Sequence, residues 1–174
     1  IQRFSGYEQI NSLQKIRYKP SEHLDLQYSF TYAGTSNAPR YDRLIQYRNG
    51  NLRFAEWNYG PMLWRMHNFQ MLHNKKTTVY DAIRLTAAYQ NYAESRIDRT
   101  KASSIRNIQA EKVDAVSINL DADKKLGKGE LFYGLEYVYN KVGSVGSKIN
   151  INTNTTVPAV SRYPNGSTWS TIGI

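Results

Sequence analysis

Two segments of the chain carry an apolar residue at every second position over long stretches. In residues 24–33 the apolar positions are Leu24, Leu26, Tyr28, Phe30 and Tyr32, and in residues 131–140 they are Leu131, Tyr133, Leu135, Tyr137 and Tyr139. A period of two places each apolar set on one face of a β-strand. Faces of this length need either a second layer of protein or lipid to cover them.

Similar segments recur along the chain, and the connectors between them alternate between short and long. We expect strands over 7–18, 23–34, 62–72 and 78–92, a fifth around Val116–Leu120, a sixth after residue 129 and a seventh over 168–174. The expected connectors are short at 19–22, 73–77 and 123–129, and long at 35–61, 93–110 and 143–167. Tight turns at one end and long loops at the other are typical of an outer-membrane β-barrel.

The length of the expected strands favours a membrane over a soluble sandwich. Twelve residues at a rise of roughly 3.3 Å extend about 40 Å, and at a tilt of about 45° they span about 28 Å. The apolar band of a membrane barrel is about 25 Å tall, whereas strands of globular proteins usually have about five or six residues. Lysines gather at the short turns, where the chain meets water; they are Lys19, Lys75, Lys76, Lys124, Lys125 and Lys128. We therefore predict an all-β fold, an antiparallel meander of long strands that forms part of a transmembrane β-barrel. A soluble antiparallel sandwich is the alternative.

The composition excludes several classes of protein and site. The 174 residues include no cysteine, which excludes disulfides and thiolate metal ligands. Lysine and arginine number 23 against 14 aspartate and glutamate, for a net charge of +9. These cations lie in the expected turns and loops and not in one stripe, so we predict no nucleic-acid partner. No apolar run reaches the roughly eighteen residues that a transmembrane helix needs. The 14 tyrosines suit either membrane–water girdles or strands in general.

The chain is expected to be part of a longer protein. It begins at Ile1 without an initiator Met or a signal sequence, and it ends a few residues into the seventh expected strand. We predict that residues 1–174 are a partial β-barrel domain of about seven strands, truncated at both ends. With two open edges, such a piece does not close into a pore by itself.

Several short motifs follow one another along the chain. They are Pro39-Arg40-Tyr41-Asp42-Arg43-Leu44, Ala55-Glu56-Trp57-Asn58-Tyr59-Gly60-Pro61, Tyr89-Gln90, Glu94-Ser95-Arg96-Ile97-Asp98-Arg99 and Glu111-Lys112-Val113-Asp114-Ala115. In this order, and with the strand–turn–strand spacing, they resemble a stretch of the TonB-dependent outer-membrane receptors. The likeness is closest to the receptors of Bacteroidetes-type bacteria, and it covers most of the chain.

This resemblance implies a protein of the bacterial outer membrane whose 22-stranded barrel is closed by an N-terminal plug. Such receptors bind a scarce nutrient outside the cell, typically a ferric siderophore, haem or cobalamin, and import it with energy relayed by TonB. The chain matches only the barrel, so the plug and the TonB-contacting segment would lie upstream. The implied partners are the TonB system through that plug, outer-membrane lipid and lipopolysaccharide, and an anionic or metal-chelate ligand.

The long loops of such a barrel are expected to meet the ligand, and arginine suits bidentate recognition of carboxylate and phosphate. The candidate ligand-binding residues are Arg40, Tyr41, Arg43, Trp57, Tyr59, Arg96 and Arg99, with Arg48 and Arg53 as further loop arginines. The arginines attract either an anionic chelate or lipopolysaccharide phosphate, or they pair locally with Asp42, Glu94 and Asp98. The aromatic residues stack either on a flat ligand or within a compact loop.

No catalytic site, metal site or cofactor is expected. The sequence holds no glycine-rich phosphate loop, no nucleophile elbow and no cysteine nucleophile. The three histidines, His23, His67 and His73, show no metal-ligand spacing. Carboxylates expected inside the barrel, Asp25, Asp121 and Glu136, are instead predicted to pair with Arg17 or Arg84.

In the third expected strand, residues 62–72, the alternation changes face. Met62, Trp64 and Met66 share one face, whereas Phe69 and Met71 share the other. A β-bulge near Asn68 is predicted to reconcile the two halves. If Trp64 and Met66 face lipid, His67 points into the lumen beside Arg65.

The leading functional hypothesis is a segment of a TonB-dependent receptor that binds and imports a scarce nutrient. A passive outer-membrane channel without a plug shares every strand feature and is the first alternative. A soluble all-β binding module or surface adhesin is the second, and it would be recovered as a monomer without detergent.

Overall fold

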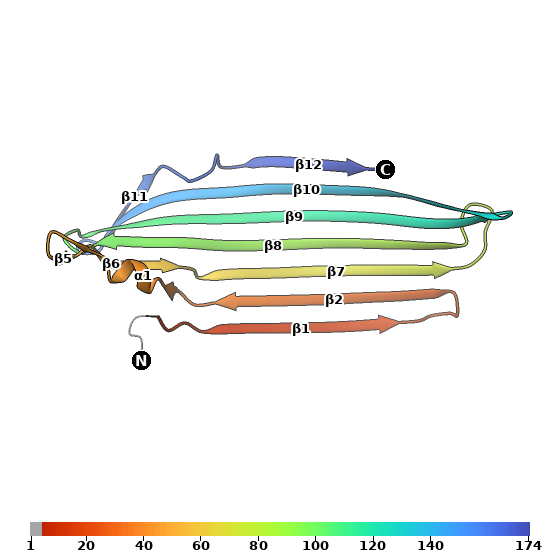
Figure 1. The fold of residues 1–174 in the computed structure, drawn as a ribbon, viewed down its shortest axis with the longest axis horizontal. Coiled ribbons are helices and arrows are strands. Elements are labelled where there is room, and N and C mark those ends of the chain that lie inside the picture. Colours follow the sequence, from red (N-terminus) through yellow and green to blue (C-terminus); the bar gives the residue numbers. More distant parts are fainter. Residues whose placement is uncertain (1–4) are drawn as a thin grey trace.

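The computed structural model describes residues 5–174; residues 1–4 of the predicted domain lie outside the described residues. Six long strands make up most of this range and follow one another as a meander (Figure 1). They are β1 (Gln9–Tyr18), β2 (Leu24–Thr35), β7 (Met62–Asn74), β8 (Ala82–Thr100), β9 (Ile105–Leu126) and β10 (Gly129–Asn150). β11 (Thr155–Ala159) and β12 (Ser167–Gly173) both pair with β10 and share the next place in the sheet.

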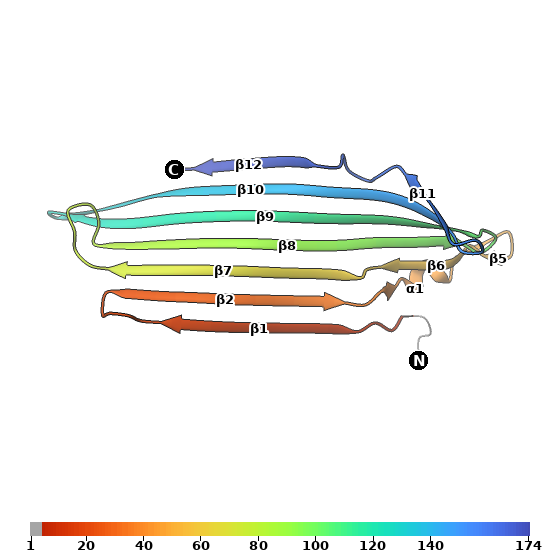
Figure 2. The same cartoon turned by 180° about the vertical axis from the view of Figure 1, so that it is seen from behind.

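The long strands are all antiparallel to their neighbours, in the order β1–β2–β7–β8–β9–β10. Seen from both sides, they lie side by side in one layer, without a second layer over their middle (Figures 1 and 2). The predicted all-β fold, an antiparallel meander of long strands, is therefore confirmed for residues 5–174. Within this range the sheet is open and does not close into a barrel.

No helix among the described residues has the length and the apolar character needed to cross a membrane.

Pairing in register joins the apolar residues of neighbouring strands into continuous rows on one face of the sheet, which we call the apolar face. The central row consists of Ile16, Tyr28, Phe69, Ala87, Ile118, Tyr137 and Ile172. The next row towards the short turns consists of Tyr18, Leu26, Met71, Leu85, Leu120 and Leu135. In the central row every large side chain is at least 36% exposed. The apolar face is thus uncovered in the described chain.

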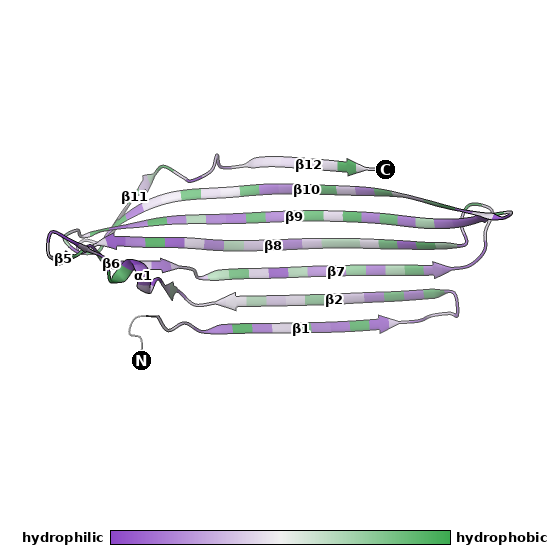
Figure 3. Cartoon of the chain, in the orientation of Figure 1, coloured by the Kyte–Doolittle hydropathy of each residue, from purple (hydrophilic) through white to green (hydrophobic). Residues whose placement is uncertain are grey.

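The opposite side of the sheet, the polar face, carries hydrophilic residues directly behind these rows. Between the two apolar rows run Arg17, Gln27, Gln70, Thr86, Asn119 and Glu136, again in register. Figure 3 shows the resulting alternation of hydropathy along the long strands. In the described chain only two hydrophobic residues, Phe54 and Ala122, are buried. The sheet therefore has no hydrophobic core of its own.

The carboxylates predicted on one side of the sheet do lie together on the polar face. Asp25 accepts a hydrogen bond from Arg17 Nε at 2.9 Å, and Arg17 Nη2 reaches the same carboxylate. The predicted Arg17–Asp25 pair is therefore confirmed. Asp121 stands directly opposite Arg84 on the neighbouring strand.

The predicted β-bulge near Asn68 is wrong. Asn68 pairs with Ser29 on one side and with Ala88 on the other, and neither ladder shifts register. His67 therefore lies on the apolar face, where its ring is 4.9 Å from the ring of Phe30 and Tyr28 shares a hydrogen bond with its Nδ1. Met62, Trp64 and Met66 lie on the polar face, and Trp64 Nε1 donates to Gln90 there at 3.2 Å. Hydrogen bonds to neighbouring strands thus hold the histidine on the apolar face and the tryptophan on the polar face, and the strand needs no bulge.

The long loops predicted at 93–110 and 143–167 are wrong over most of their length. β8 continues to Thr100 and β9 begins at Ile105, which leaves a turn of 101–104, and β10 continues to Asn150. The outer halves of these strands carry polar residues on both faces, so the alternation in hydropathy disappears while the hydrogen-bonded ladder continues. The connector 36–61 also contains short elements; they are β3 (Ala38–Pro39), α1 (Tyr41–Leu44), β4 (Tyr47–Arg48), β5 (Asn51–Leu52) and β6 (Phe54–Tyr59). The strict alternation of short and long connectors is lost.

Candidate functional site

The connector between β2 and β7 is built onto the end of the sheet opposite the short turns, which we call the outer end (Figure 1). β6 pairs with the outer half of β8, so that Tyr59 stands opposite Arg96. β3 pairs with β6, and the backbone N–H of Arg40 donates to the carbonyl oxygen of Trp57 at 2.9 Å. These contacts hold α1 against β6 on the polar face.

Three arginines and two aromatic side chains meet at this place; we call Arg40, Arg43, Trp57, Tyr59 and Arg96 the arginine–aromatic cluster. The Trp57 and Tyr59 rings lie edge to face with their centroids 5.0 Å apart. The guanidinium carbon of Arg40 is 4.9 Å from the Trp57 centroid and 5.4 Å from the Tyr59 centroid. Arg43 lies 5.9 Å over Trp57, and Arg96 lies 5.1 Å over Tyr59. All four distances are within the range of cation–π attraction.

The cluster carries an excess of positive charge. Asp42 accepts a hydrogen bond from Arg40 Nε at 2.9 Å and lies 3.8 Å from Arg43 Nε. The hydrogen bond from Arg40, more than any other contact, holds the pKa of Asp42 below its usual range. Arg40 and Arg43 thus share one carboxylate, and Arg96 adds a third positive charge without pairing to it.

Two donors of the cluster are left without acceptors. Arg43 Nε and Arg96 Nε are buried and make no hydrogen bond to the described residues. A buried donor without an acceptor is unfavourable by about 1–3 kcal/mol, more for a charged group. The carboxylate or phosphate oxygens of an anionic ligand are the acceptors that fit guanidinium donors best.

A second ionic group lies at the outer end of the apolar face. Glu56 accepts hydrogen bonds from Arg99 Nε at 2.9 Å and from Arg106 Nε at 2.6 Å. Hydrogen bonds from Arg106 and then from Arg99 lower the pKa of Glu56 against the opposing effect of its partial burial. Arg99 also donates to the Ser103 carbonyl oxygen at 3.0 Å. Arg99 is therefore occupied by structural contacts.

Five of the seven predicted ligand-binding residues come together in the cluster, and two do not. Tyr41 is 37% exposed on α1, and Arg99 belongs to the group around Glu56. Both Arg96 and Arg99 lie on β8 and not in a loop. The local alternative is present for Arg40 and Arg43, which pair with Asp42; Arg96 stacks on Tyr59 instead of pairing with a carboxylate. The predicted packing of aromatic residues within the loop is also present.

The sequence did not suggest a further feature at the polar face: residues 160–166, between β11 and β12, lie beside β10 and reach over this face with side chains, and we call them the strap. Gln109 Nε2 donates to the carbonyl oxygen of Val160 at 3.0 Å. Arg162 Nη1 lies 3.8 Å from one carboxylate oxygen each of Glu94 and Glu111, and Glu111 is only 6% exposed. Because Gln109 stands opposite Arg96, the strap borders the arginine–aromatic cluster. The one sequence signal is Gly146, whose missing side chain makes room for the strap.

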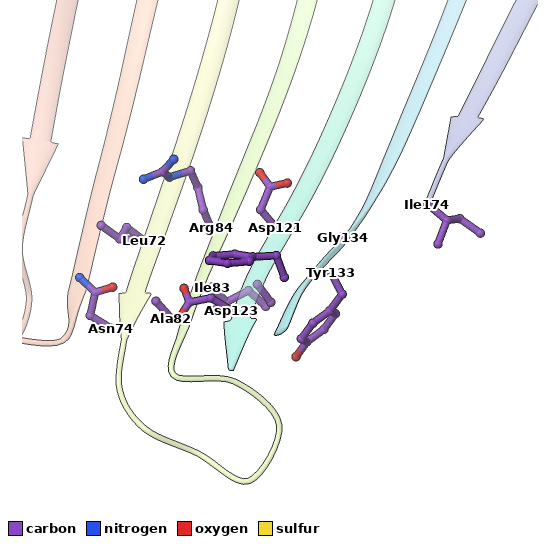
Figure 4. A pocket seen from close by; sticks show the side chains of 12 residues that line it. Leu72, Asn74, Ala82, Ile83, Arg84, Asp121, Asp123, Tyr133, Gly134 and Ile174 are labelled. Carbon is purple, nitrogen blue, oxygen red and sulfur yellow. The ribbon is translucent and has the colours of Figure 1, made fainter. Parts of the chain in front are cut away.

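A hollow at the short-turn end lies far from this cluster. It encloses about 710 Å³ and is lined by Leu72, Arg84, Asp121 and Phe132, among others. Figure 4 shows Arg84 and Asp121 rising from neighbouring strands above it. Among the described residues no group of three His, Cys, Asp or Glu side chains is arranged to hold a metal ion.

Comparison with known proteins adds no relative: no protein-family model, no curated protein and no solved structure matches the chain.

Proposed function

We propose that the chain is part of a transmembrane β-barrel of the bacterial outer membrane, within a TonB-dependent receptor that binds and imports a scarce nutrient. The uncovered apolar face, backed by a polar face across the same strands, carries this proposal. Lipid is a partner that covers such a face without a second protein layer, and the polar face suits the water-filled or plugged interior of a barrel. If further strands of the same protein close the sheet into a 22-stranded barrel, the unpaired backbone groups at both of its open edges find partners.

The height of the apolar band supports the membrane assignment. On β2 the band extends from Leu24 to Tyr32, nine residues that at roughly 3.3 Å rise cover about 30 Å. A strand tilt of about 35–45° reduces this to about 21–25 Å, close to the band of about 25 Å in known membrane barrels. Tyrosines lie near both edges of the band: Tyr89 and Tyr139 are one row inside its outer edge, and Tyr18 and Tyr133 are in the two rows nearest the short turns. Aromatic residues at both edges suit membrane–water interfaces.

The arginine–aromatic cluster is the proposed contact with the nutrient. It lies on the polar face and beyond the apolar band, because Arg96 follows Tyr89 by seven residues on β8. A ligand held there would be inside the barrel wall at the extracellular side. The cluster offers guanidinium donors that lack acceptors, and it also offers aromatic faces. Together these favour an anionic metal chelate or a similar planar anion.

The membrane arrangement is tested by cysteine labelling, which the absence of native cysteine makes straightforward. In intact cells, a membrane-impermeant maleimide is expected to label Asn152→Cys at the outer end and not Lys128→Cys at a short turn. In detergent-free outer membranes, Asn119→Cys on the polar face should be labelled far faster than its neighbour Leu120→Cys on the apolar face. Equal labelling of Asn119→Cys and Leu120→Cys would contradict a lipid-covered apolar face.

The transport proposal is tested by uptake in cells that express the gene product containing this chain. The probes are ferric citrate, haem and cobalamin, each measured with and without a functional TonB. We expect TonB-dependent uptake of one anionic probe, and its loss in the triple variant Arg40→Ala, Arg43→Ala, Arg96→Ala. The control is Arg48→Ala, an exposed arginine on β4 outside the cluster. Uptake that persists without TonB would support a passive channel, and uptake of none of the three would contradict import of these nutrients.

A further inference from the structure

Two glutamates face each other on the polar face, beside the arginine–aromatic cluster. Glu94 on β8 stands directly opposite Glu111 on β9, and the next polar-face row outwards pairs Arg96 with Gln109. Like charges directly opposite each other on antiparallel strands are unfavourable. A cation placed between the two carboxylates would balance this pair.

The strap supplies such a cation, but the fit is loose. Arg162 Nη1 lies 3.8 Å from one oxygen of each glutamate, which is beyond hydrogen-bond distance. Tyr92 OH donates to Glu94 at 3.0 Å, whereas neither carboxylate oxygen of Glu111 accepts a hydrogen bond from a described residue. Glu111 is only 6% exposed, and buried polar groups are normally hydrogen-bonded. Arg162 therefore offsets the charge of the pair and leaves buried acceptors unused.

A third buried acceptor lies between this pair and the arginine–aromatic cluster. Gln109 donates to the strap through Nε2, but its Oε1 is buried and accepts no hydrogen bond from the described residues. Gln109 also lines a hollow of about 770 Å³, which is bounded by Asp98, Lys148 and Val160, among others. Because Gln109 stands opposite Arg96, whose Nε is a buried donor without an acceptor, unused acceptors and unused donors are neighbours on the polar face.

We propose that Glu94 and Glu111 form a subsite for a primary ammonium group of the nutrient, and that Arg162 occupies this subsite until the nutrient displaces it. The inference rests on the proposed function, because it takes the arginine–aromatic cluster as the contact for the anionic group of the same nutrient. An ammonium group is more compact than a guanidinium, and its three donors rotate to suit their acceptors. It reaches carboxylate oxygens at about 2.8 Å, whereas Arg162 stays at 3.8 Å from both.

The positions of the two subsites define the class of nutrient, which is a zwitterion with well-separated charges. Glu94 and Arg96 are two residues apart on one face of β8, so their backbones are about 7 Å apart. A molecule that contacts both therefore carries its ammonium and its anionic group several bonds apart, unlike an α-amino acid. When it displaces Arg162, the strap loses its ion pairs with β8 and β9, and amide exchange of residues 160–166 should accelerate.

The test measures the binding of small probes to the full-length gene product in detergent, by isothermal titration calorimetry. The main probe is 6-aminohexanoate, whose ammonium and carboxylate groups are far enough apart to reach both subsites. Hexanoate lacks the ammonium group, and glycine carries its two charges too close together. We expect 6-aminohexanoate to bind at least about 10-fold more tightly than either, because only it makes charge-assisted hydrogen bonds at both subsites.

Three variants assign the effect to named residues. The isosteric double variant Glu94→Gln, Glu111→Gln should bind 6-aminohexanoate about 10-fold more weakly than the wild type, without weakening the binding of hexanoate. The matched control Glu136→Gln changes a glutamate of the same face in the inner half of β10 and should bind both probes as the wild type does. Arg162→Ala removes the resident cation, so 6-aminohexanoate should bind about 10-fold more tightly. An arginine that only supports the fold would not have this effect.

The outcomes separate this inference from the proposed function. Equal affinity of the wild type for 6-aminohexanoate and hexanoate, or no binding of 6-aminohexanoate, overturns the ammonium subsite without recourse to any variant. Undiminished binding by the double glutamine variant overturns it as well. Binding that is not tightened in Arg162→Ala overturns the displacement of the strap. None of these measurements needs membrane insertion or TonB, whereas the labelling and uptake experiments above decide the proposed function.

Discussion

Replacing Ile118 by arginine tests the central claim about the apolar face. Ile118 lies in the middle row of the apolar band, between Ala87 on β8 and Tyr137 on β10, and its side chain is 42% exposed in the described chain. Nothing in the sheet packs over it, so the arginine would meet no protein obstacle. In water such a surface substitution changes stability by no more than about 0.5 kcal/mol.

In a membrane the same substitution is much more costly. The middle row lies about half-way up a band of about 21–25 Å, so Ile118→Arg would place a guanidinium near the bilayer midplane. Arginine at that depth on the lipid face of a barrel destabilises it by about 2–4 kcal/mol. This corresponds to about a 30- to 900-fold change in the folding equilibrium.

Two controls isolate the effect of lipid. Ser117→Arg changes the adjacent residue on the polar face, and Ala110→Arg lies on the apolar face but eight residues further out, beyond the band. Equilibrium unfolding of the full-length product from lipid vesicles by guanidinium chloride gives the three free energies. We expect a loss of about 2–4 kcal/mol for Ile118→Arg and less than about 1 kcal/mol for each control. A loss for Ile118→Arg no larger than that of Ser117→Arg would refute the lipid contact.

Three further predictions concern the outer end of the sheet. Gly146→Ala would place a Cβ 2.3 Å from the carbonyl oxygen of Val160, so we expect the strap to detach at a cost of about 1–3 kcal/mol and amide exchange of residues 160–166 to accelerate. In the control Gly143→Ala the Cβ meets nothing closer than 3.7 Å, and this exchange should stay unchanged. Glu56 has a lowered pKa in the fold, so its stabilising effect is present above its ordinary pKa of 4.5 and is lost as the pH falls through the lowered value. The protection factors for amide exchange of residues 101–106, which correct for the intrinsic pH dependence of exchange, should fall at acid pH in the wild type and stay constant in this range in Glu56→Gln. Trp57→Ala removes the ring under two guanidinium groups, and amide exchange of residues 40–44 should accelerate about 5- to 30-fold; an unchanged rate would mean that the stacking does not hold α1 in place.

The inner halves of the strands could be predicted from the sequence because one face of each is apolar. β2 and the first half of β10 carry an apolar residue at every second position, and their observed pairing places Leu26 and Leu135 in one row, as period-two faces require. A one-residue shift of either strand would move its entire apolar set to the polar face, so register and hydropathy support each other. The same reasoning fails for β7, where both faces carry apolar and polar residues. There the neighbours decide: Tyr28 hydrogen-bonds His67 on the apolar face, and Gln90 accepts from Trp64 on the polar face.

The arginine–aromatic cluster could be predicted in part, because its residue types were visible but their positions were not. Tyr59 and Arg96 are far apart in sequence, and they meet only because β6 pairs with the outer half of β8. No local pattern encodes that pairing. Arg99, three residues after Arg96, points to the other face and is taken up by Glu56. Residue type alone therefore overestimates the number of ligand-binding arginines.

Polar and charged residues make the outer halves of the strands hard to recognise in the sequence. The same residues are the ones that could bind a ligand there. In the proposed membrane arrangement, lipid does not require one face to be apolar beyond the band, so Glu94, Arg96 and Glu111 can stand on β8 and β9 without breaking the ladder. In this outer part the polar face carries the arginine–aromatic cluster and the strap, while the apolar face carries Arg65 and Lys141 just beyond the apolar band. Strand pairing fixes where these groups stand, and the loss of alternation allows them to be charged. A hydropathy pattern that ends inside a strand thus indicates where the wall of such a protein becomes available for binding.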